Sequence, residues 1–131
     1  MGNRPQLKDG KAEKLITFIY YKDMQKGADF YGGLLGFPLE IDQGKVSKIF
    51  RISEGGYLGI VDEAEGMQNW HKDKTVQVCI RVPNVDEWYE FCKETGMKNL
   101  SQLFESSALK IKAFVFDDPE GYQVEFQEST E

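Results

Sequence analysis

Hydrophobic residues alternate with polar ones in several short stretches of the chain, which is the pattern of strands with one buried face. The clearest stretch is residues 75–82, TVQVCIRV, in which every second residue is valine or isoleucine. The other stretches are short, rich in β-branched and aromatic residues, and mostly bounded by glycines. They cover residues 15–21, 37–42, 46–52, 56–61, 100–104, 109–116 and 122–126. The pattern therefore predicts eight strands.

Two stretches show the 3.6-residue period of an amphipathic helix instead. The first follows Asp23, a residue type that caps helix N-termini, and ends at a glycine. The second follows Asn84, which with Glu87 three residues later resembles a capping box, and it also ends at a glycine. Residues 62–74 are polar and acidic and are interpreted as a connector. The predicted order is β-α-β-β-β, the connector, and β-α-β-β-β again.

The second half of the chain repeats the first. The two helix caps lie 61 residues apart, and the last strand of each half opens with Gly-Tyr, at Tyr57 and Tyr122. A repeat on this scale indicates a duplicated structural module. We therefore expect one α+β domain, residues 1–131, built from module one, residues 15–63, and module two, residues 75–128.

Composition and charge limit the partners and the compartment. The chain is 40% hydrophobic and 29% charged, and no apolar run approaches the roughly 20 residues that span a bilayer. A net charge of -6 argues against nucleic acid as a partner. The polar residues 1–14 lack the apolar segment of a signal peptide, and Cys79 and Cys92 are expected to stay reduced. We therefore expect a cytoplasmic protein that binds neither membranes nor nucleic acids.

Two short motifs carry more specific information. Asp23 is followed by Phe30-Tyr31 and then by Leu-Gly-Phe at residues 35–37. Near the C-terminus, the turn Asp-Pro-Glu-Gly at residues 118–121 is followed by Glu125. With the duplication, these motifs resemble the vicinal oxygen chelate superfamily, which includes glyoxalase I, extradiol dioxygenases and bleomycin-binding proteins. The fold hosts many chemistries, so the resemblance does not define an activity.

The resemblance covers about residues 15–128 and implies an eight-stranded, curved mixed sheet, called the cup, with helices on its outer face. It also implies a divalent metal in the cup, held on the first and last strands of each module. These positions fall on Ile16, Ile60, Gln77 and Glu125. Isoleucine cannot bind a metal, and two remaining donors are fewer than a catalytic site usually has. We therefore predict no cofactor, with a divalent metal as the disfavoured alternative.

The two-residue period of the strands predicts which side chains line the cup. In module one these are Ile16, Phe18, Tyr20, Leu58, Ile60 and either Phe50 or Ile52. In module two they are Gln77, Cys79, Arg81, Gln123, Glu125 and Gln127. One half is apolar and the other polar, which suits a small organic ligand with a few polar groups. The predicted ligand contacts are Phe18, Tyr20, Phe50, Leu58, Gln77, Arg81, Gln123 and Glu125.

The same residues also have purely structural interpretations. Glu125 could pair with Arg81 or Lys112 across the sheet, because a buried carboxylate needs such a partner. The aromatic residues of module one could fill the core. Trp70 and His71 in the connector could cover the cleft or belong to a surface loop.

Three functions are compatible with such a face. The preferred hypothesis is a metal-free, homodimeric protein that binds a small organic molecule, as the resemblance to bleomycin-binding proteins implies. The alternative is a metal-dependent lyase or dioxygenase, in which Glu125 acts as ligand or general base beside Gln77. The third is a dimerising or regulatory domain that does not use its cup.

Overall fold

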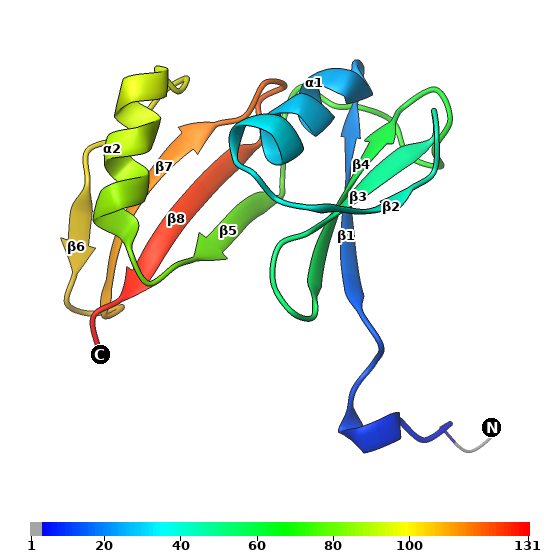
Figure 1. Ribbon diagram of the computed structural model, residues 1–131, viewed down its shortest axis with the longest axis horizontal. Helices are drawn as coiled ribbons and strands as arrows, with labels where there is room; N and C mark the ends of the chain where they lie inside the picture. The colour runs from blue at the N-terminus through cyan, green and yellow to red at the C-terminus, as the bar shows by residue number, and fades with distance from the viewer. Residues whose placement is uncertain (1–3) are drawn as a thin grey trace. The chain divides into compact units, whose positions relative to one another are not determined.

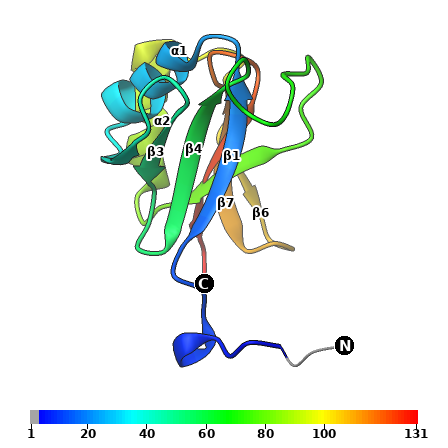
Figure 2. The ribbon, with the colours of Figure 1, turned by 90° about the vertical axis from the view of Figure 1, so that its right-hand side faces the viewer.

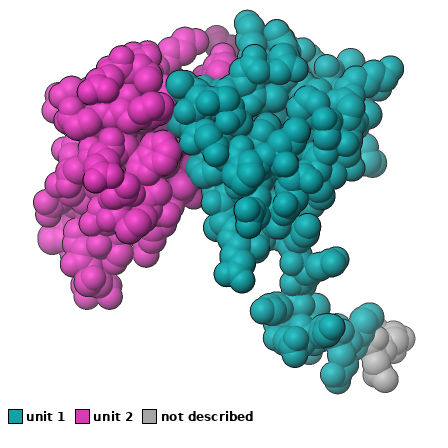
Figure 3. Space-filling model, in the orientation of Figure 1, with its two compact units in different colours: residues 1–68 teal, residues 69–131 magenta. Residues whose placement is uncertain are grey.

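The computed structural model describes residues 4–131, so the first three residues of the predicted domain lie outside it. The chain divides into two compact units, which Figure 3 colours separately. Unit 1 ends at Gln68 and unit 2 spans Asn69–Glu131. Within residues 4–131, no helix combines the length and the apolar character that crossing a membrane requires.

Unit 1 has the predicted order of elements after a short 3-10 turn, η1. Its four strands form one mixed sheet in the order β1-β4-β3-β2, in which β1 runs parallel to β4. Figure 2 shows β4 between β1 and β3. The helix α1 continues into a π-helical segment, η2. The elements are η1 (Lys8–Gly10), β1 (Leu15–Tyr21), α1 (Met24–Ala28), η2 (Asp29–Leu34), β2 (Leu39–Asp42), β3 (Ser47–Arg51) and β4 (Gly56–Asp62).

One face of the unit 1 sheet is covered by α1 (Figure 1). The side chain of Asp23 accepts a hydrogen bond from the backbone N–H of Gln25 at 3.2 Å, which confirms the predicted cap. At Gly27 the helix lies so close to the sheet that a Cβ would be 2.7 Å from Ile60 Cγ2 and 2.9 Å from the ring of Tyr21. Ile60 and Tyr21 are fully buried there, so the core of unit 1 lies on the helix side of the sheet.

Unit 2 repeats the arrangement, with strand order β5-β8-β7-β6 and β5 parallel to β8. The helix α2 packs on β7 and β8, where the Trp88 ring stacks on Phe126 at 4.7 Å between ring centres. Beneath it, the rings of Phe114, Phe116 and Phe126 stack on one another and are fully buried. The elements are β5 (Gln77–Arg81), α2 (Val85–Thr95), β6 (Phe104–Ser106), β7 (Ile111–Asp117) and β8 (Gln123–Ser129).

The N-terminus of α2 differs from the predicted capping box. The side chain of Asn84 donates to Glu87 Oε2 at 2.9 Å and caps no helix amide. Glu128 Oε1, from β8, instead accepts a hydrogen bond from the backbone N–H of Val85 at 2.9 Å. A carboxylate 43 residues away therefore replaces the local cap, which sequence spacing does not reveal. The helix ends as predicted, at Gly96 in the left-handed conformation.

The α+β class and the two tandem βαβββ modules are confirmed. The eight strands are hydrogen-bonded as two four-stranded sheets, one in each unit. The predicted boundaries were least accurate at β6, which begins at Phe104 rather than at residue 100. Before it, Lys98 forms an isolated bridge with Asp117, and Ser101 N donates to Val115 O, so the chain follows β7 without forming a regular strand.

Candidate functional site

A row of polar side chains lies on the face of the unit 2 sheet that α2 does not cover. Because β5 and β8 are parallel neighbours, Cα partners in register project from the same face. The partners are Gln77 with Gln123, Cys79 with Glu125, and Arg81 with Gln127. The residues between them on β8, Val124 and Phe126, are fully buried on the side of α2. The structure thus brings together the four residues of module two that the sequence nominated as ligand contacts.

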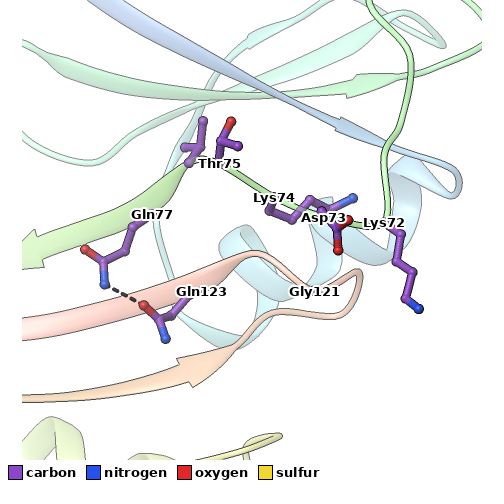
Figure 4. A pocket seen from close by; sticks show the side chains of 8 residues that line it. Lys72, Asp73, Lys74, Thr75, Gln77, Gly121 and Gln123 are labelled. Atoms are coloured by element: carbon purple, nitrogen blue, oxygen red, sulfur yellow. Dashed lines mark hydrogen bonds between the residues drawn. The ribbon is translucent and has the colours of Figure 1, made fainter.

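Hydrogen bonds order this row into two groups. Gln77 Nε2 donates to Gln123 Oε1 at 2.6 Å, as Figure 4 shows. Arg81 Nε donates to Gln127 Oε1 at 2.8 Å, and Gln127 Nε2 donates to Glu125 Oε2, also at 2.8 Å. Gln127 therefore links the guanidinium to the carboxylate. Arg81 is exposed and Glu125 is half-buried, so the row is open to solvent.

The direct partners expected for Glu125 are thus corrected. Arg81 is connected to Glu125 through Gln127 rather than by an ion pair. Lys112 lies on the opposite face, where its Nζ is 2.8 Å from Asp86 Oδ1 of α2. That hydrogen bond raises the pKa of Lys112. A side chain on the helix side of the sheet cannot reach Glu125, because neighbouring faces alternate along the strand.

An open cavity of about 390 Å³ lies where β5 and β8 begin. Gln77 and Gln123 line it from the two strands, and Gly121 lines it from the turn before β8 (Figure 4). The remaining lining comes from the segment that leads into β5. Those residues are Lys72, Asp73, Lys74, Thr75 and Val76.

Lys74 fixes this segment against the β8 turn. Its ammonium lies 3.6 Å from the ring centre of Trp70 and 4.8 Å from that of Tyr122, and it donates a hydrogen bond to the carbonyl of His71. An ammonium over aromatic faces is attracted by their negative charge density. The sequence predicted a polar connector here, in which Trp70 and His71 could cover the cleft or belong to a surface loop. Its role in the cavity depends on this long-range contact with Tyr122. No periodicity marks such a segment in the sequence.

Cys79 occupies the middle of the polar row. Burial raises the pKa of its thiol above the usual value, the negative charge of Glu125 raises the pKa further, and the positive charge of Arg81 lowers it. The thiol is therefore protonated near neutral pH, which does not favour a role as nucleophile. Cys79 is an exposed residue, so the reactivity of its thiol can be used to measure the effect of the charges around it.

Replacing Glu125 with glutamine is expected to speed the alkylation of Cys79 by iodoacetamide at pH 8 by a few-fold. Loss of the carboxylate charge lowers the pKa of the thiol and so increases the thiolate fraction. Arg81→Gln is expected to slow the reaction for the opposite reason. Peptide mass spectrometry gives the rate, with Cys92 as an internal reference, because it is fully buried and burial raises its pKa to about 12. Equal rates in the three proteins would contradict this electrostatic arrangement.

The unit 1 sheet also has one face that α1 does not cover. Phe18 lies on it and is 45% exposed. Its ring lies against Gly59 of β4, where a Cβ would be 2.4 Å from Phe18 Cδ1. Ile16 and Tyr20 share this face through the two-residue period of β1. The aromatic residues predicted on β1 are therefore placed together on the open face.

The faces predicted for β3 and β4 are wrong by one residue. The register of β1 and β4 pairs Phe18 with Gly59 and Ile19 with Ile60, so Ile60 shares the side of α1. Leu58 lies two residues before Ile60 and faces the same way. Both side chains are buried.

Phe50 belongs to the same buried side. It pairs with Leu58 in register, and a Cβ on Gly32 of η2 would lie 2.6 Å from Phe50 Cε1. Phe50 and Leu58 therefore fill the core beneath the helical segment and do not line the open face. That face carries Tyr57, Gly59 and Val61 from β4 instead.

This register changes the comparison between the two modules. Cys79 pairs with Glu125 as Phe18 pairs with Gly59, so Gly59 rather than Ile60 is the counterpart of Glu125. The metal-ligand positions that the superfamily resemblance implies then read Ile16, Gly59, Gln77 and Glu125. Within either unit, the described residues contain no group of three or more His, Cys, Asp or Glu that could hold a metal ion. These donors do not fit a metal centre of the family type.

Comparisons with known proteins agree with this architecture. The family model described as Glyoxalase/Bleomycin resistance protein/Dioxygenase superfamily matches residues 15–126. No curated protein matches the chain significantly.

Several solved structures resemble most or all of the chain. A glyoxalase/dioxygenase from Nostoc punctiforme is 19% identical, with 99% of this chain and 100% of that chain covered and a TM-score of 0.71. TioX from Micromonospora sp. ML1 is 19% identical, with 90% and 99% covered and a TM-score of 0.71. Lactoylglutathione lyase from Agrobacterium tumefaciens is 17% identical, with 88% and 92% covered and a TM-score of 0.71. These likenesses show the fold, and the match to the family model shows that the chain belongs to the Glyoxalase/Bleomycin resistance protein/Dioxygenase superfamily.

Proposed function

We propose that this protein binds a small organic molecule at the polar row of unit 2 and does so without a metal cofactor. The observation that carries the proposal is the solvent-open row of hydrogen-bonding side chains that leads into the cavity at the start of β5 and β8. A few polar groups placed around a concave surface are typical of ligand sites.

The pair Gln77 and Gln123 shows how a ligand would be recognised. Each amide has donors and an acceptor, and the bond between them uses one donor of Gln77 and the oxygen of Gln123. The oxygen of Gln77 and the remaining N–H groups of Gln123 are then held in place for a ligand (Figure 4). Further along the row, Arg81 and Glu125 add one charge of each sign. A ligand with both donors and acceptors fits this arrangement best.

Unit 1 has aromatic side chains on its own open face. Phe18 and Tyr20 line a cavity within that unit and offer ring surface that an apolar group can contact. Phe50 and Leu58, which the sequence predicted as ligand contacts, are not part of the proposed site, because they are buried on the side of α1. A homodimer is part of the proposal, since the resemblance to bleomycin-binding proteins implies one.

A cytoplasmic location is also proposed. Cys79 and Cys92 are both free thiols in the structure, and thiols persist in reducing compartments. The net charge of -6 supports a partner other than nucleic acid.

A compound that binds at the polar row is expected to raise the melting temperature and to slow the alkylation of Cys79, which it covers. At ten times its Kd, binding to the native state alone stabilises by about 1.4 kcal/mol. The screen uses full-length protein in EDTA and a library of aromatic amides and carboxylates. Gln123→Ala is expected to reduce both effects. Gln102→Ala is the matched control, because Gln102 is an exposed glutamine of the same unit outside the cavity.

Metal analysis separates this function from the metal-dependent alternative. A lyase or dioxygenase of this superfamily would require a divalent ion at Gln77 and Glu125, with Glu125 as ligand or general base. A tightly bound, stoichiometric divalent metal in the purified protein would overturn the metal-free proposal. Loss of that metal and of turnover in Glu125→Gln would then establish the enzyme.

A further inference from the structure

Unit 1 has a cavity of its own, of about 190 Å³, on the face that α1 does not cover. The rings of Phe18 and Tyr20 line it from β1. Glu65 lines it from the loop after β4, together with Gly66 and Met67. Aromatic rings and a carboxylate therefore share one small space. None of these loop residues took part in the ligand contacts predicted from the sequence.

The loop is held against Tyr20 by two contacts. Gly66 approaches the ring so closely that a Cβ would lie 2.5 Å from Tyr20 Cε2 and 2.7 Å from Val61 Cγ1. The backbone N–H of Met67 donates to the hydroxyl of Tyr20 at 3.4 Å. Only glycine allows this approach, so the sequence at position 66 sets the place of the neighbouring Glu65.

Glu65 makes the edge of the cavity negative. Its side chain is 36% exposed, and Lys45 Nζ lies 3.5 Å from its Oε1. The Lys45 side chain is 84% exposed, so this ion pair is screened by water and is easily broken. The carboxylate thus already attracts an ammonium group, which another cation can replace at small cost.

We propose that this cavity binds the cationic group of a small ligand, an ammonium or a methylated ammonium. Cations are attracted to the faces of aromatic rings, and a carboxylate at the edge adds to that attraction. The volume suits one such group and is below that of a site for a drug-sized molecule. The inference goes beyond the proposed function, because it assigns unit 1 a site of its own and names the chemical class of the group bound there.

The test compares choline with 3,3-dimethylbutan-1-ol, its neutral analogue of the same shape, on the full-length protein. Amide resonances of Gly66 and Met67 are followed by NMR as each compound is titrated. Choline is expected to bind at least about threefold more tightly than the alcohol. Glu65→Gln is expected to lower the affinity for choline by about threefold and to leave the affinity for the alcohol unchanged. Lys45→Gln is expected to raise the affinity for choline by about twofold. Glu54→Gln, which removes the same charge from an exposed turn of unit 1, is the matched control.

A second variant tests the aromatic part. Phe18→Leu keeps an apolar side chain but removes a ring, so the affinity for choline should fall while the alcohol still binds. Equal affinity for choline and the alcohol, or no saturable binding of choline to the native protein, would overturn the cationic class. An unchanged choline affinity in both Glu65→Gln and Phe18→Leu would also overturn it. The proposed function is judged separately, by the compound screen at Gln77 and Gln123.

Discussion

Replacing Phe126 with alanine is expected to lower the free energy of unfolding by about 3–5 kcal/mol. Phe126 is fully buried on β8. Its ring stacks on Trp88 of α2 at 4.7 Å, and on Phe114 and Phe116 of β7 at 5.7 Å and 6.0 Å. One side chain on β8 therefore packs against both α2 and the neighbouring strand β7, and its loss leaves a cavity that rigid neighbours cannot fill. Urea denaturation followed by circular dichroism measures the change.

The adjacent residue provides the control. Gln127→Ala removes a side chain from the open face of the same strand, and surface changes of this kind usually shift stability by less than about 1 kcal/mol. A loss of that small size for Phe126→Ala would contradict the packing described for α2. The control also removes the bridge between Arg81 and Glu125, so it tests the polar row without disturbing the core.

The strands and helices could be predicted from sequence because the signals that define them are local. In β8, Val124 and Phe126 alternate with Glu125 and Gln127, and the structure buries the first pair under α2. Burial of one face and exposure of the other is the condition under which a two-residue period can be read. For that reason the polar row of unit 2 was assigned to the correct face.

The same reasoning failed in β4 for a physical reason. This strand lies between β1 and β3, and Tyr57, Leu58, Ile60 and Val61 are all buried. A strand with buried apolar residues on both faces shows no alternation, so its faces cannot be assigned from hydrophobicity. Aligning the Gly-Tyr pairs of the two modules made Ile60 the counterpart of Glu125, which is one residue away from the true counterpart, Gly59. Only the register with β1, which puts Gly59 beside Phe18, defines the open face.

Contacts between distant segments of unit 2 could not be predicted from the sequence patterns either. Glu128 caps α2 from the last strand, Gln127 stands between two charges, and Lys74 joins the connector to Tyr122. Each contact depends on where a strand ends or on how two distant segments pack together. A local period in the sequence contains neither kind of information. The residues of the polar row were therefore predicted, whereas their hydrogen-bond partners were predicted only in part.

Replacing Asp118 with alanine is the second change with a large expected effect. Asp118 is fully buried in the turn between β7 and β8. Its Oδ1 accepts hydrogen bonds from the backbone N–H groups of Glu120 at 3.0 Å and Tyr122 at 2.9 Å. Two bonds to a carboxylate at about 1.5 kcal/mol each give an expected loss of about 3 kcal/mol.

The substitution is also expected to disturb the cavity of unit 2. The turn that Asp118 holds places Gly121 in the cavity wall and Tyr122 against Lys74, immediately before Gln123. Asp118→Asn keeps an oxygen acceptor and should cost about 1 kcal/mol, and Glu94→Ala, on the exposed surface of α2, should cost less than about 0.5 kcal/mol. Urea denaturation orders the three variants, and the NMR resonances of Gln77 and Gln123 report the cavity. If Asp118→Asn costs as much as Asp118→Ala, the negative charge rather than the acceptor oxygen holds the turn, and the hydrogen-bond account of this hairpin is wrong.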